Sequence, residues 1–367
     1  MASFALAAFV MTQRYFNQNA MEKLNVLLWN VEWMNDLFDT AGNFRPDDAI
    51  PQHSPDTTVR TRRDHLSGVM AEIDPDVVIV VEGPNSDKEL QLFFDTDMAG
   101  TWITKVQPTK GSSQLIGCAI RTDRGKFDAA NPLKFFDTVN KDQFPEFQPF
   151  DIDTEDDGVI ERYRFERSPL YVEIRTAGGN PVRFLGLHLK SKGIFDAYEW
   201  SKWWEVADAN RRKLLAQATQ VRLNFLNKYL LNDETANIPL IVCGDINDGP
   251  GLDASEKRIL GSGIERLMGT VWSPGLCLGN ALFDYCLTPA DRLNLRFEKI
   301  YTTSFRDPIF NNTWHKEWID HVLYSRNRPL PWVTNARIFT EMPDGQKIWA
   351  KYPHASDHMP VWVELSL

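Results

Sequence analysis

Short apolar runs recur along the chain and predict the buried strands of an α/β domain. Each run is a few residues long and is closed by polar residues, Gly or Pro, a pattern typical of strands covered on both faces. A Gly-Gly turn between two further apolar segments predicts a hairpin around residues 177–180. The predicted strands are Leu24–Trp29, Val77–Val81, Leu115–Arg121, Val182–Leu189, Ile238–Val242, Trp318–Tyr324 and Val361–Leu365.

Helical periodicity separates several of these runs. One apolar stripe ends at an Asp-Pro stop signal, and a second belongs to a long helix that begins in a Trp-rich segment. The two stripes are Leu66, Val69, Met70 and Ile73, and Leu214, Ala218, Val221, Phe225 and Tyr229. The acidic stretch 144–166 shows no regular pattern, and we expect short helices and loops over 251–316. No linker or repeat divides the chain, so we predict one domain over 21–367 after a poorly ordered or loosely packed extension over 1–20.

The composition is that of an ordinary soluble globular protein. The chain has 367 residues, of which 43% are hydrophobic and 25% charged. A net charge of -10 argues against a protein that coats nucleic acid through bulk electrostatics, although a local basic groove stays compatible with it. No apolar run is long enough to span a bilayer.

The cysteines and the N-terminal segment bear on localisation. Cys118, Cys243, Cys277 and Cys286 lack the paired spacing of a metal site, and Cys243 lies in an apolar run. Buried free thiols in a reducing compartment are the expected reading, which predicts a cytoplasmic protein. Residues 1–20 have no basic region before their apolar run, so we favour an extension upstream of a start at Met21. If they are instead a signal peptide, the protein is secreted or periplasmic.

Polar residues interrupt the apolar pattern at equivalent places. Some follow a predicted strand and the others precede one, and antiparallel pairing brings strand exits beside strand entrances. Each residue taken alone is explained by turn or cap chemistry, but their shared position predicts one polar edge of a sheet core. At the exits lie Asn30, Glu82, His188, Asp245 and Asn247, and at the entrances lie Asp320, Asp357 and His358.

These segments resemble the endonuclease/exonuclease/phosphatase superfamily, the deoxyribonuclease-I-like fold, in a bacterial-type form. The matching motifs are Trp29-Asn30-Val31-Glu32, Val81-Glu82, His188-Leu189-Lys190-Ser191, Gly244-Asp245-Ile246-Asn247, Ile319-Asp320-His321 and Ser356-Asp357-His358. Two departures leave every ligand in place: Ser168 stands within an Arg-Pro-Pro-like element, and Val81 replaces a common Gln. The resemblance implies a four-layer α/β/β/α sandwich of two mixed, largely antiparallel sheets. It also implies a divalent-metal phosphoesterase.

The resemblance assigns a role to each polar position. Glu82 would be the principal ligand of Mg²⁺, with Mn²⁺ as the alternative, and Asn30, Glu32 and Asp357 would supply further oxygens. Asp320 would orient His358 for proton handling. For the remaining residues the resemblance implies that Asp245 would position or deprotonate the attacking water, Asn247 would donate to a phosphoryl oxygen, His188 would stabilise negative charge on phosphorus, and Arg167, Lys190 and Ser191 would bind substrate. Whether Asp245 or His358 is the general base stays open.

Several alternatives remain at this stage. The leading hypothesis is a phosphodiesterase, either a nuclease or an enzyme for small diesters; the others are a phosphomonoesterase on a sugar, inositol or lipid phosphate, and an inactive binding module. The substrate is a phosphoester, with nucleic acid as one candidate, and nothing indicates a protein partner. Two basic clusters would either guide a polyanion or form solvated helix faces: Arg60, Arg62 and Arg63, and Arg211, Arg212 and Lys213.

An acidic loop at 153–158 has the first half of a calcium-loop pattern. Its twelfth position is Arg164, where a calcium loop places a bidentate Glu. We therefore favour a solvated loop and expect no structural Ca²⁺ there.

Overall fold

Two six-stranded sheets lie face to face in the computed structural model. It describes residues 22–154, 157–194, 200–251, 256–307, 313–328 and 331–367, so the predicted extension over 1–20 lies outside the described residues. The first sheet has the order β15-β16-β1-β2-β4-β3 and the second the order β11-β14-β10-β9-β8-β5. Their strands are β1 (Lys23–Asn30), β2 (Val77–Gly83), β3 (Trp102–Val106), β4 (Leu115–Arg121), β15 (Val333–Ile338) and β16 (Val361–Ser366), and β5 (Leu133–Phe136), β8 (Leu170–Arg175), β9 (Pro181–His188), β10 (Leu240–Asp245), β11 (Leu278–Asn280) and β14 (Asp320–Ser325).

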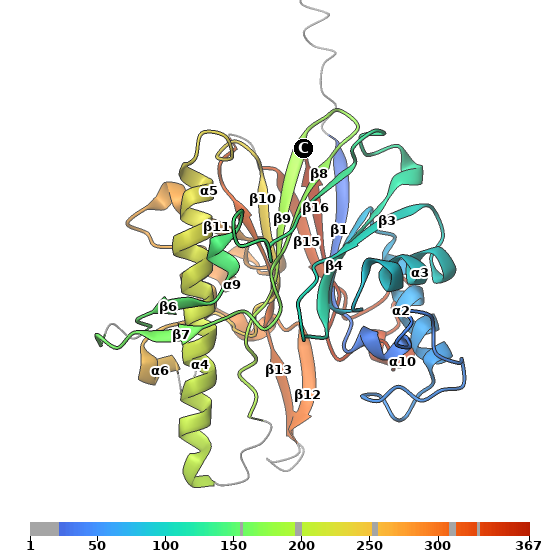
Figure 1. The fold of residues 1–367 in the computed structure, drawn as a ribbon, viewed down its shortest axis with the longest axis horizontal. Helices are drawn as coiled ribbons and strands as arrows, with labels where there is room; N and C mark the ends of the chain where they lie inside the picture. Colours follow the sequence, from blue (N-terminus) through green and yellow to red (C-terminus); the bar gives the residue numbers. More distant parts are fainter. Residues whose placement is uncertain (1–21, 155–156, 195–199, 252–255, 308–312, 329–330) are drawn as a thin grey trace, which may run out of the picture.

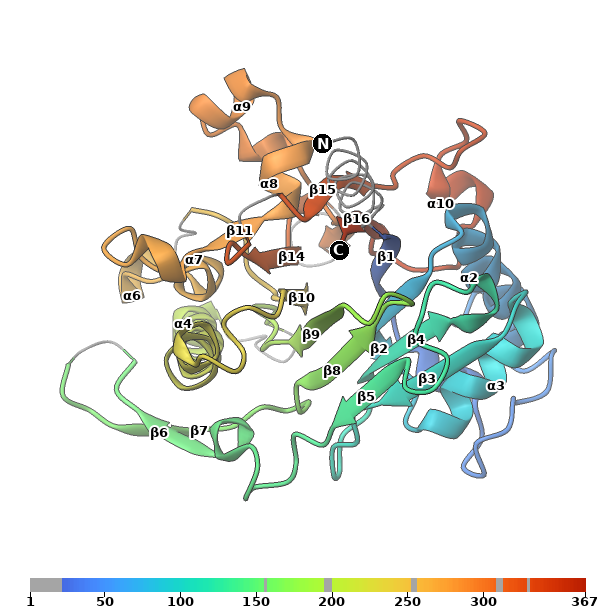
Figure 2. The same ribbon diagram turned by 90° about the horizontal axis from the view of Figure 1, so that it is seen from above.

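Helices cover the outer face of each sheet, which completes four layers (Figures 1 and 2). On one side lie α2, α3 and α10, and on the other the long helix formed by α4, a π-helical turn and α5. The predicted four-layer α/β/β/α sandwich is thereby confirmed. The helices are α2 (Val59–Ile73), α3 (Asp87–Asp97), α4 (Trp203–Gln220), α5 (Asn227–Leu231), α6 (Glu256–Ile259), α7 (Gly263–Met268), α8 (Ala281–Cys286), α9 (Pro289–Leu293) and α10 (Ile348–Lys351), with short 3₁₀ or π turns at Met34–Leu37, Thr122–Arg124, Pro145–Phe147, Trp200–Lys202, Val221–Leu226, Pro274–Leu276 and Phe297–Lys299.

The core has three layers because both sheets are apolar on both faces. Side chains such as Val26, Ile79 and Phe184 fill the space between the sheets. Leu66 and Met70 of α2 pack on the outer face of the first sheet, and the stripe of α4 to α5 packs on the second. Both predicted helical stripes are buried, which confirms them. None of the described helices is both long and apolar enough to cross a membrane.

Register explains how distant residues meet. Strands β1 and β2 are parallel, so their ends, Asn30 and Val81, are paired neighbours. Strand β10 is parallel to β9 and antiparallel to β14, so Asp245 is paired with His188 on one side and with Asp320 on the other. The exit of β10 therefore lies beside the entrance of β14, as expected from the position of the polar residues.

Two small hairpins correct the expectation of irregular structure. Strands β6 (Phe150–Ile152) and β7 (Glu161–Tyr163) pair within the acidic stretch, and β12 (Thr303–Asp307) pairs with β13 (Thr313–Glu317). Each forms a separate two-stranded sheet. In Figure 1 the β12–β13 hairpin extends beyond the end of the two large sheets. Such free-standing hairpins lack the continuous apolar run that identifies a core strand, which is why the apolar pattern did not predict them.

Candidate active site

One row of the second sheet places three of the expected residues side by side. His188, Asp245 and Asp320 occupy paired positions on β9, β10 and β14, and all three are buried. Strands can approach this closely because residue 244 is Gly: a Cβ there would lie 1.8 Å from the carbonyl oxygen of Leu187, at a φ of +145°. The Gly of the Gly-Asp-x-Asn motif therefore has a steric reason to precede Asp245.

Asn30 joins the first sheet to this row. Its Nδ2 donates to Glu82 Oε1 at 3.2 Å and to Asp245 Oδ2 at 3.1 Å. Its Oδ1 accepts from the backbone N–H of Glu32 at 3.0 Å. The amide nitrogen thus faces the two carboxylates and fixes their separation, while the amide oxygen supports the loop that follows β1.

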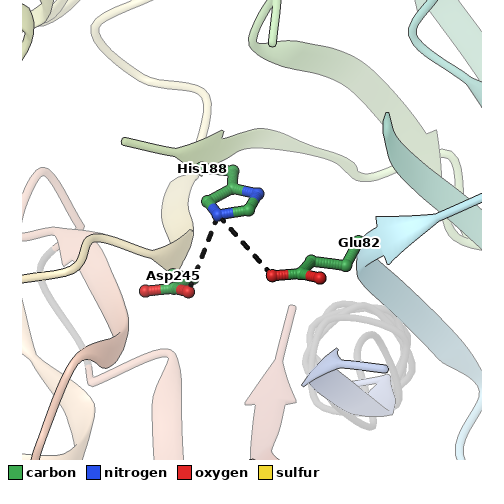
Figure 3. A group of neighbouring side chains, drawn as sticks. All are labelled: Glu82, His188 and Asp245. Atoms are coloured by element: carbon green, nitrogen blue, oxygen red, sulfur yellow. Dashed lines mark ion pairs between the residues drawn. The ribbon is translucent and has the colours of Figure 1, made fainter. Parts of the chain in front are cut away.

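His188 lies between the carboxylates of the two sheets (Figure 3). Its Nε2 is 3.9 Å from Glu82 Oε1 and 3.8 Å from Asp245 Oδ2. Complete burial, with smaller contributions from the nearby charges of Arg167 and His358, holds the pKa of His188 well below its usual value. The imidazole is therefore neutral, and its Nδ1 is a buried atom without a hydrogen-bond partner among the described residues.

His358 and Asp320 form the second close pair. His358 Nδ1 donates to Asp320 Oδ2 at 2.7 Å, and Trp29 Nε1 fixes the backbone of His358 by donating to its carbonyl oxygen at 2.9 Å. Burial lowers the pKa of His358, but the carboxylates of Asp320, Asp357 and Asp245 outweigh it and hold the pKa well above its usual value. This imidazole is cationic at neutral pH, unlike that of His188.

The segments after β1 and before β16 bring Glu32 and Asp357 together. Glu32 Oε2 accepts from the backbone N–H of Asp357 at 3.3 Å, and Ser356 Oγ donates to the carbonyl oxygen of Asn30 at 2.7 Å. Burial and the nearby Asp357 raise the pKa of Glu32 to about 7. The guanidinium of Arg62, which is 3.9 Å from Glu32 Oε2, opposes that rise.

The carboxylates at this site carry more negative charge than their surroundings neutralise. Burial and Asp320 raise the pKa of Asp245 to about 8, because ionised acids this close repel one another. Ligand atoms of Glu82, His188 and Asp245 lie within 4.8 Å of one another, as do those of Asp245, Asp320 and His358. Hard oxygen donors in this density suit a divalent cation, whose charge would favour the ionised acids.

Backbone strain is concentrated here. Left-handed backbone angles in non-glycine residues cost about 1–3 kcal/mol each and persist where the surroundings impose them. Strand β2 carries an irregularity between Val80 and Gly83 that turns the Glu82 side chain into the site. The strained residues at the site are Glu32 (φ 48), Trp33 (φ 52), Glu82 (φ 55), Gln114 (φ 59) and Asn247 (φ 57).

Gln114, just before β4, is a site residue that the motifs did not predict. Only 5% exposed, it donates through Nε2 to Glu82 Oε2 and accepts through Oε1 from Arg167. It supplies an amide to Glu82, although Val81 stands where a Gln commonly precedes this Glu. A lone Gln that follows two serines and precedes an apolar run gives no periodic signal, so the sequence alone could not place it.

Arg62 corrects the interpretation of the basic cluster on α2. Arg62 is 2% exposed and donates to the backbone carbonyls of Val31 and Glu32, while Arg63 is 4% exposed and forms a bidentate pair with Asp97. Neither one is a solvated helix residue or a guide for a polyanion. Arg62 instead holds the strained segment that carries Glu32, because its guanidinium donates hydrogen bonds to the backbone carbonyls of that segment.

The residues expected to bind substrate lie around the same row. Arg167 contacts Gln114. Lys190, two residues after the end of β9, is half-buried, and burial, with smaller contributions from Lys213 and Arg167, lowers its pKa. Ser191 Oγ accepts from the backbone N–H of Gly193 at 3.1 Å. The side-chain Nδ2 of Asn247 donates to the carbonyl oxygen of Leu189 at 3.2 Å, while its backbone N–H donates to Asp245 Oδ1 at 2.9 Å.

In the acidic loop at 153–158, one carboxylate accepts hydrogen bonds from the backbone of the loop itself. Asp153 accepts from the backbone N–H groups of Asp157 and Gly158, and the loop connects β6 to β7, over the α4 side of the molecule (Figure 2). Residues 155–156, which complete the calcium-like pattern, lie outside the described residues. Among the described residues, this loop forms no cluster of ligand atoms comparable with that at the ends of β2, β9 and β10.

Comparison with known proteins gives structural likenesses at low identity. No family model matches the chain, and no curated protein matches it. An endonuclease/exonuclease/phosphatase family protein from Bacteroides thetaiotaomicron is 14% identical with a TM-score of 0.49, covering 95% of this chain and 98% of that one.

Two further solved structures are similar to a comparable degree. D. rerio TDP2, complexed with a single-strand DNA product, is 14% identical with a TM-score of 0.48, covering 94% of this chain and 99% of that one. The human Nocturnin catalytic domain, with a bound sulfate anion, is 15% identical with a TM-score of 0.46, covering 94% and 93%.

Proposed function

We propose that this chain is a divalent-metal-dependent phosphodiesterase of the endonuclease/exonuclease/phosphatase superfamily. The observation that carries the proposal is the junction of the two sheets, where Asn30 hydrogen-bonds both Glu82 and Asp245. Carboxylates, a neutral His and a cationic His paired with an Asp meet there from separate segments of the chain. Their positions agree with every motif that carries the resemblance to the superfamily.

The carboxylates would hold the cation. Glu82 is the ligand we assign first, with Asp357 and Glu32 supplying oxygens nearby or through water and Asn30 holding Glu82 in place; Mg²⁺ or Mn²⁺ suits such a set. Bound there, the cation would supply Lewis-acid polarisation of a phosphoryl oxygen. The raised pKa values of Glu32 and Asp245 fit this assignment, because excess negative charge is what a cation relieves.

His358 and Asp245 would play different parts in the reaction because their protonation states differ. His358 starts protonated, so it cannot accept a proton from water, and its role is to stabilise negative charge on the phosphoryl group. Asp245, once ionised, is the remaining candidate to accept the proton of the attacking water. The proposal therefore takes Asp245 as the general base.

The other polar residues would fix the phosphoryl group. His188 is neutral and can donate one N–H without bringing a second positive charge. Asn247 has an N–H beyond the one it gives to Leu189. Arg167 contacts Gln114, and Lys190 and Ser191 follow β9; these three residues would contact the remainder of the substrate.

A substrate panel with matched variants tests the proposal. Purified protein is incubated with plasmid, single-stranded DNA, RNA, a bis-aryl phosphate and an aryl monophosphate, in Mg²⁺ and in excess chelator. We expect hydrolysis of at least one diester that requires the cation, together with loss of turnover in Glu82→Gln. The control is Glu341→Gln, which neutralises an exposed acid paired with Lys347.

Each other result has a distinct meaning. Full activity in chelator contradicts the cation site, and preference for the monophosphate favours a phosphomonoesterase. Binding of Mg²⁺ by calorimetry without turnover of any substrate would favour the binding module.

A further inference from the structure

The base of the β12–β13 hairpin contacts residues of the candidate active site. Thr303 Oγ1 donates to the carbonyl oxygen of Asp357 at 3.1 Å, and Thr303 forms a β-bridge with His358. At the other strand, Glu317 is followed within three residues by Asp320. Among the described residues neither strand joins one of the large sheets, so the hairpin is an arm whose base is shared with two catalytic segments.

One face of this arm is basic and aromatic. Register pairs Arg306 with Trp314 and Ser304 with Lys316, which puts these four side chains on the same face, while Phe305 and His315 occupy the other. The Arg306 guanidinium lies 4.9 Å from the Trp314 ring centroid, and the Lys316 ammonium lies 4.4 Å from that of Tyr301. Trp314 is 58% exposed, and both cations belong to exposed residues.

We propose that this face, formed by Tyr301, Arg306, Trp314 and Lys316, binds the single-stranded nucleic-acid part of the substrate beyond the scissile phosphate. The inference rests on the proposed phosphodiesterase function and names its substrate class. Two cations aligned with an exposed indole match a chain that alternates phosphates with bases.

Charge and continuity favour this occupant. In a chain of net charge -10, a basic face next to the catalytic His is a local exception, and a polyanion is its complement. An indole can stack a base only when that base is unpaired, which favours a single strand over a duplex. A phospholipid is also a phosphodiester, so the catalytic chemistry alone does not separate the two occupants. The pairing of each aromatic ring with a cation is what favours a chain of alternating phosphates and bases over a lipid surface.

Binding of a fluorescein-labelled oligothymidylate, measured by anisotropy in chelator, tests the inference without requiring turnover. We expect Trp314→Leu to weaken binding about tenfold, the range for loss of one stacked base, and Trp314→Phe to retain most of the affinity. The logarithm of the association constant falls linearly with the logarithm of the salt concentration, and Arg306→Gln and Lys316→Gln should each make this slope shallower by about 0.7. The control is Trp349→Leu, which removes another half-exposed Trp near a Lys, 5.8 Å from the Nζ of Lys347, on α10.

The outcomes separate this inference from the proposed function. Unchanged affinity in Trp314→Leu and in the two charge variants overturns the inference, as does absence of oligonucleotide binding by the intact protein. Vesicles of phosphatidylcholine and phosphatidylserine are the second probe: loss of vesicle binding alone in these variants also overturns it and identifies a membrane surface. Hydrolysis of a bis-aryl phosphate in Mg²⁺ is measured in parallel, and its absence bears on the proposed function whatever the oligonucleotide result.

Discussion

Asp320 and His358 are 38 residues apart, yet Asp320 Oδ2 accepts from His358 Nδ1 at 2.7 Å with both side chains buried. Asp320 is anchored independently, because its backbone N–H donates to Thr302 Oγ1 at 2.9 Å. The second carboxylate oxygen, Oδ1, has no hydrogen-bond partner among the described residues. Within the described part of the chain, the Asp320 carboxylate therefore hydrogen-bonds the imidazole alone.

The pair should behave as one unit on mutation. His358→Ala is expected to lower kcat by about three decades or more, the upper range for a positioned acid–base or electrostatic group, and Asp320→Ala by less, since a misoriented imidazole keeps part of its function. The double variant should be scarcely worse than His358→Ala alone. Steady-state kinetics of the three variants measures this, with Mg²⁺ affinity as the control that should stay nearly unchanged. Fully additive losses would show that Asp320 acts independently of His358.

The fold and most of the site follow from local signals in the sequence. The buried strands are short apolar runs, and Glu82, Asp245 and His358 sit at their ends, where a polar residue is an exception to the pattern. The register that pairs Asp245 with both His188 and Asp320 is not local, because it depends on how β9, β10 and β14 are ordered in the sheet. The motifs provided that information only through their resemblance to a family.

What the sequence did not predict lacks periodicity. Gln114 has a left-handed backbone, and its side chain contacts Glu82 and Arg167 from distant segments. Arg62 has the pattern of a helix-surface cation, and its burial depends on the contact with the segment after β1. Most described residues of the β12–β13 hairpin beyond Thr303 are exposed or half-buried, so its sequence shows no apolar pattern typical of a core strand. These features depend on tertiary contacts, which local propensity does not encode.

The acidic loop at 153–158 is expected to play no part in catalysis. Asp153 already accepts two backbone N–H groups of its own loop, an arrangement that closes a turn without a metal. We predict that replacing Asp153, Glu155 and Asp157 with Ala leaves kcat and KM within about twofold. The check is kinetics combined with melting in Ca²⁺ and in chelator. Lost turnover with an unchanged melting temperature in both would contradict it, whereas stabilisation of the intact protein by Ca²⁺ would reveal a structural site.

The buried His321 should lower the free energy of unfolding in mild acid. Its imidazole is buried between the carbonyl oxygen of Asp248 at 2.8 Å and the side chain of Asn280 at 3.1 Å, and burial lowers its pKa from 6.5 to about 4. Between those values the unfolded chain binds a proton that the folded protein does not, so stability is present above 6.5 and is lost as the pH falls. The expected loss between pH 7 and pH 5 is about 2 kcal/mol.

Urea unfolding at the two pH values checks this, with His321→Gln as the comparison. Gln can still donate to the Asp248 carbonyl but does not titrate, so its stability should fall less with pH by about that amount. An equal pH dependence in the two proteins would show that other groups cause the acid loss.

Gln114 is expected to position Glu82 at the cost of backbone strain. Its φ of 59 is the left-handed conformation that Gly adopts without a steric penalty, whereas its amide supplies one of the contacts that fix Glu82 Oε2, the other being the backbone N–H of Trp33 at 3.1 Å. Gln114→Gly should therefore keep or raise the melting temperature while weakening Mg²⁺ affinity about 10- to 100-fold, the usual effect of losing a group that orients a ligand. Gln114→Ala removes the same contacts but keeps the strained backbone, so it should lose the same affinity and also be less stable than the Gly variant. Calorimetric Mg²⁺ binding and thermal unfolding of both variants separate the two effects. A purely structural role would leave Mg²⁺ affinity intact in the Gly variant, because the fold around β4 is retained there.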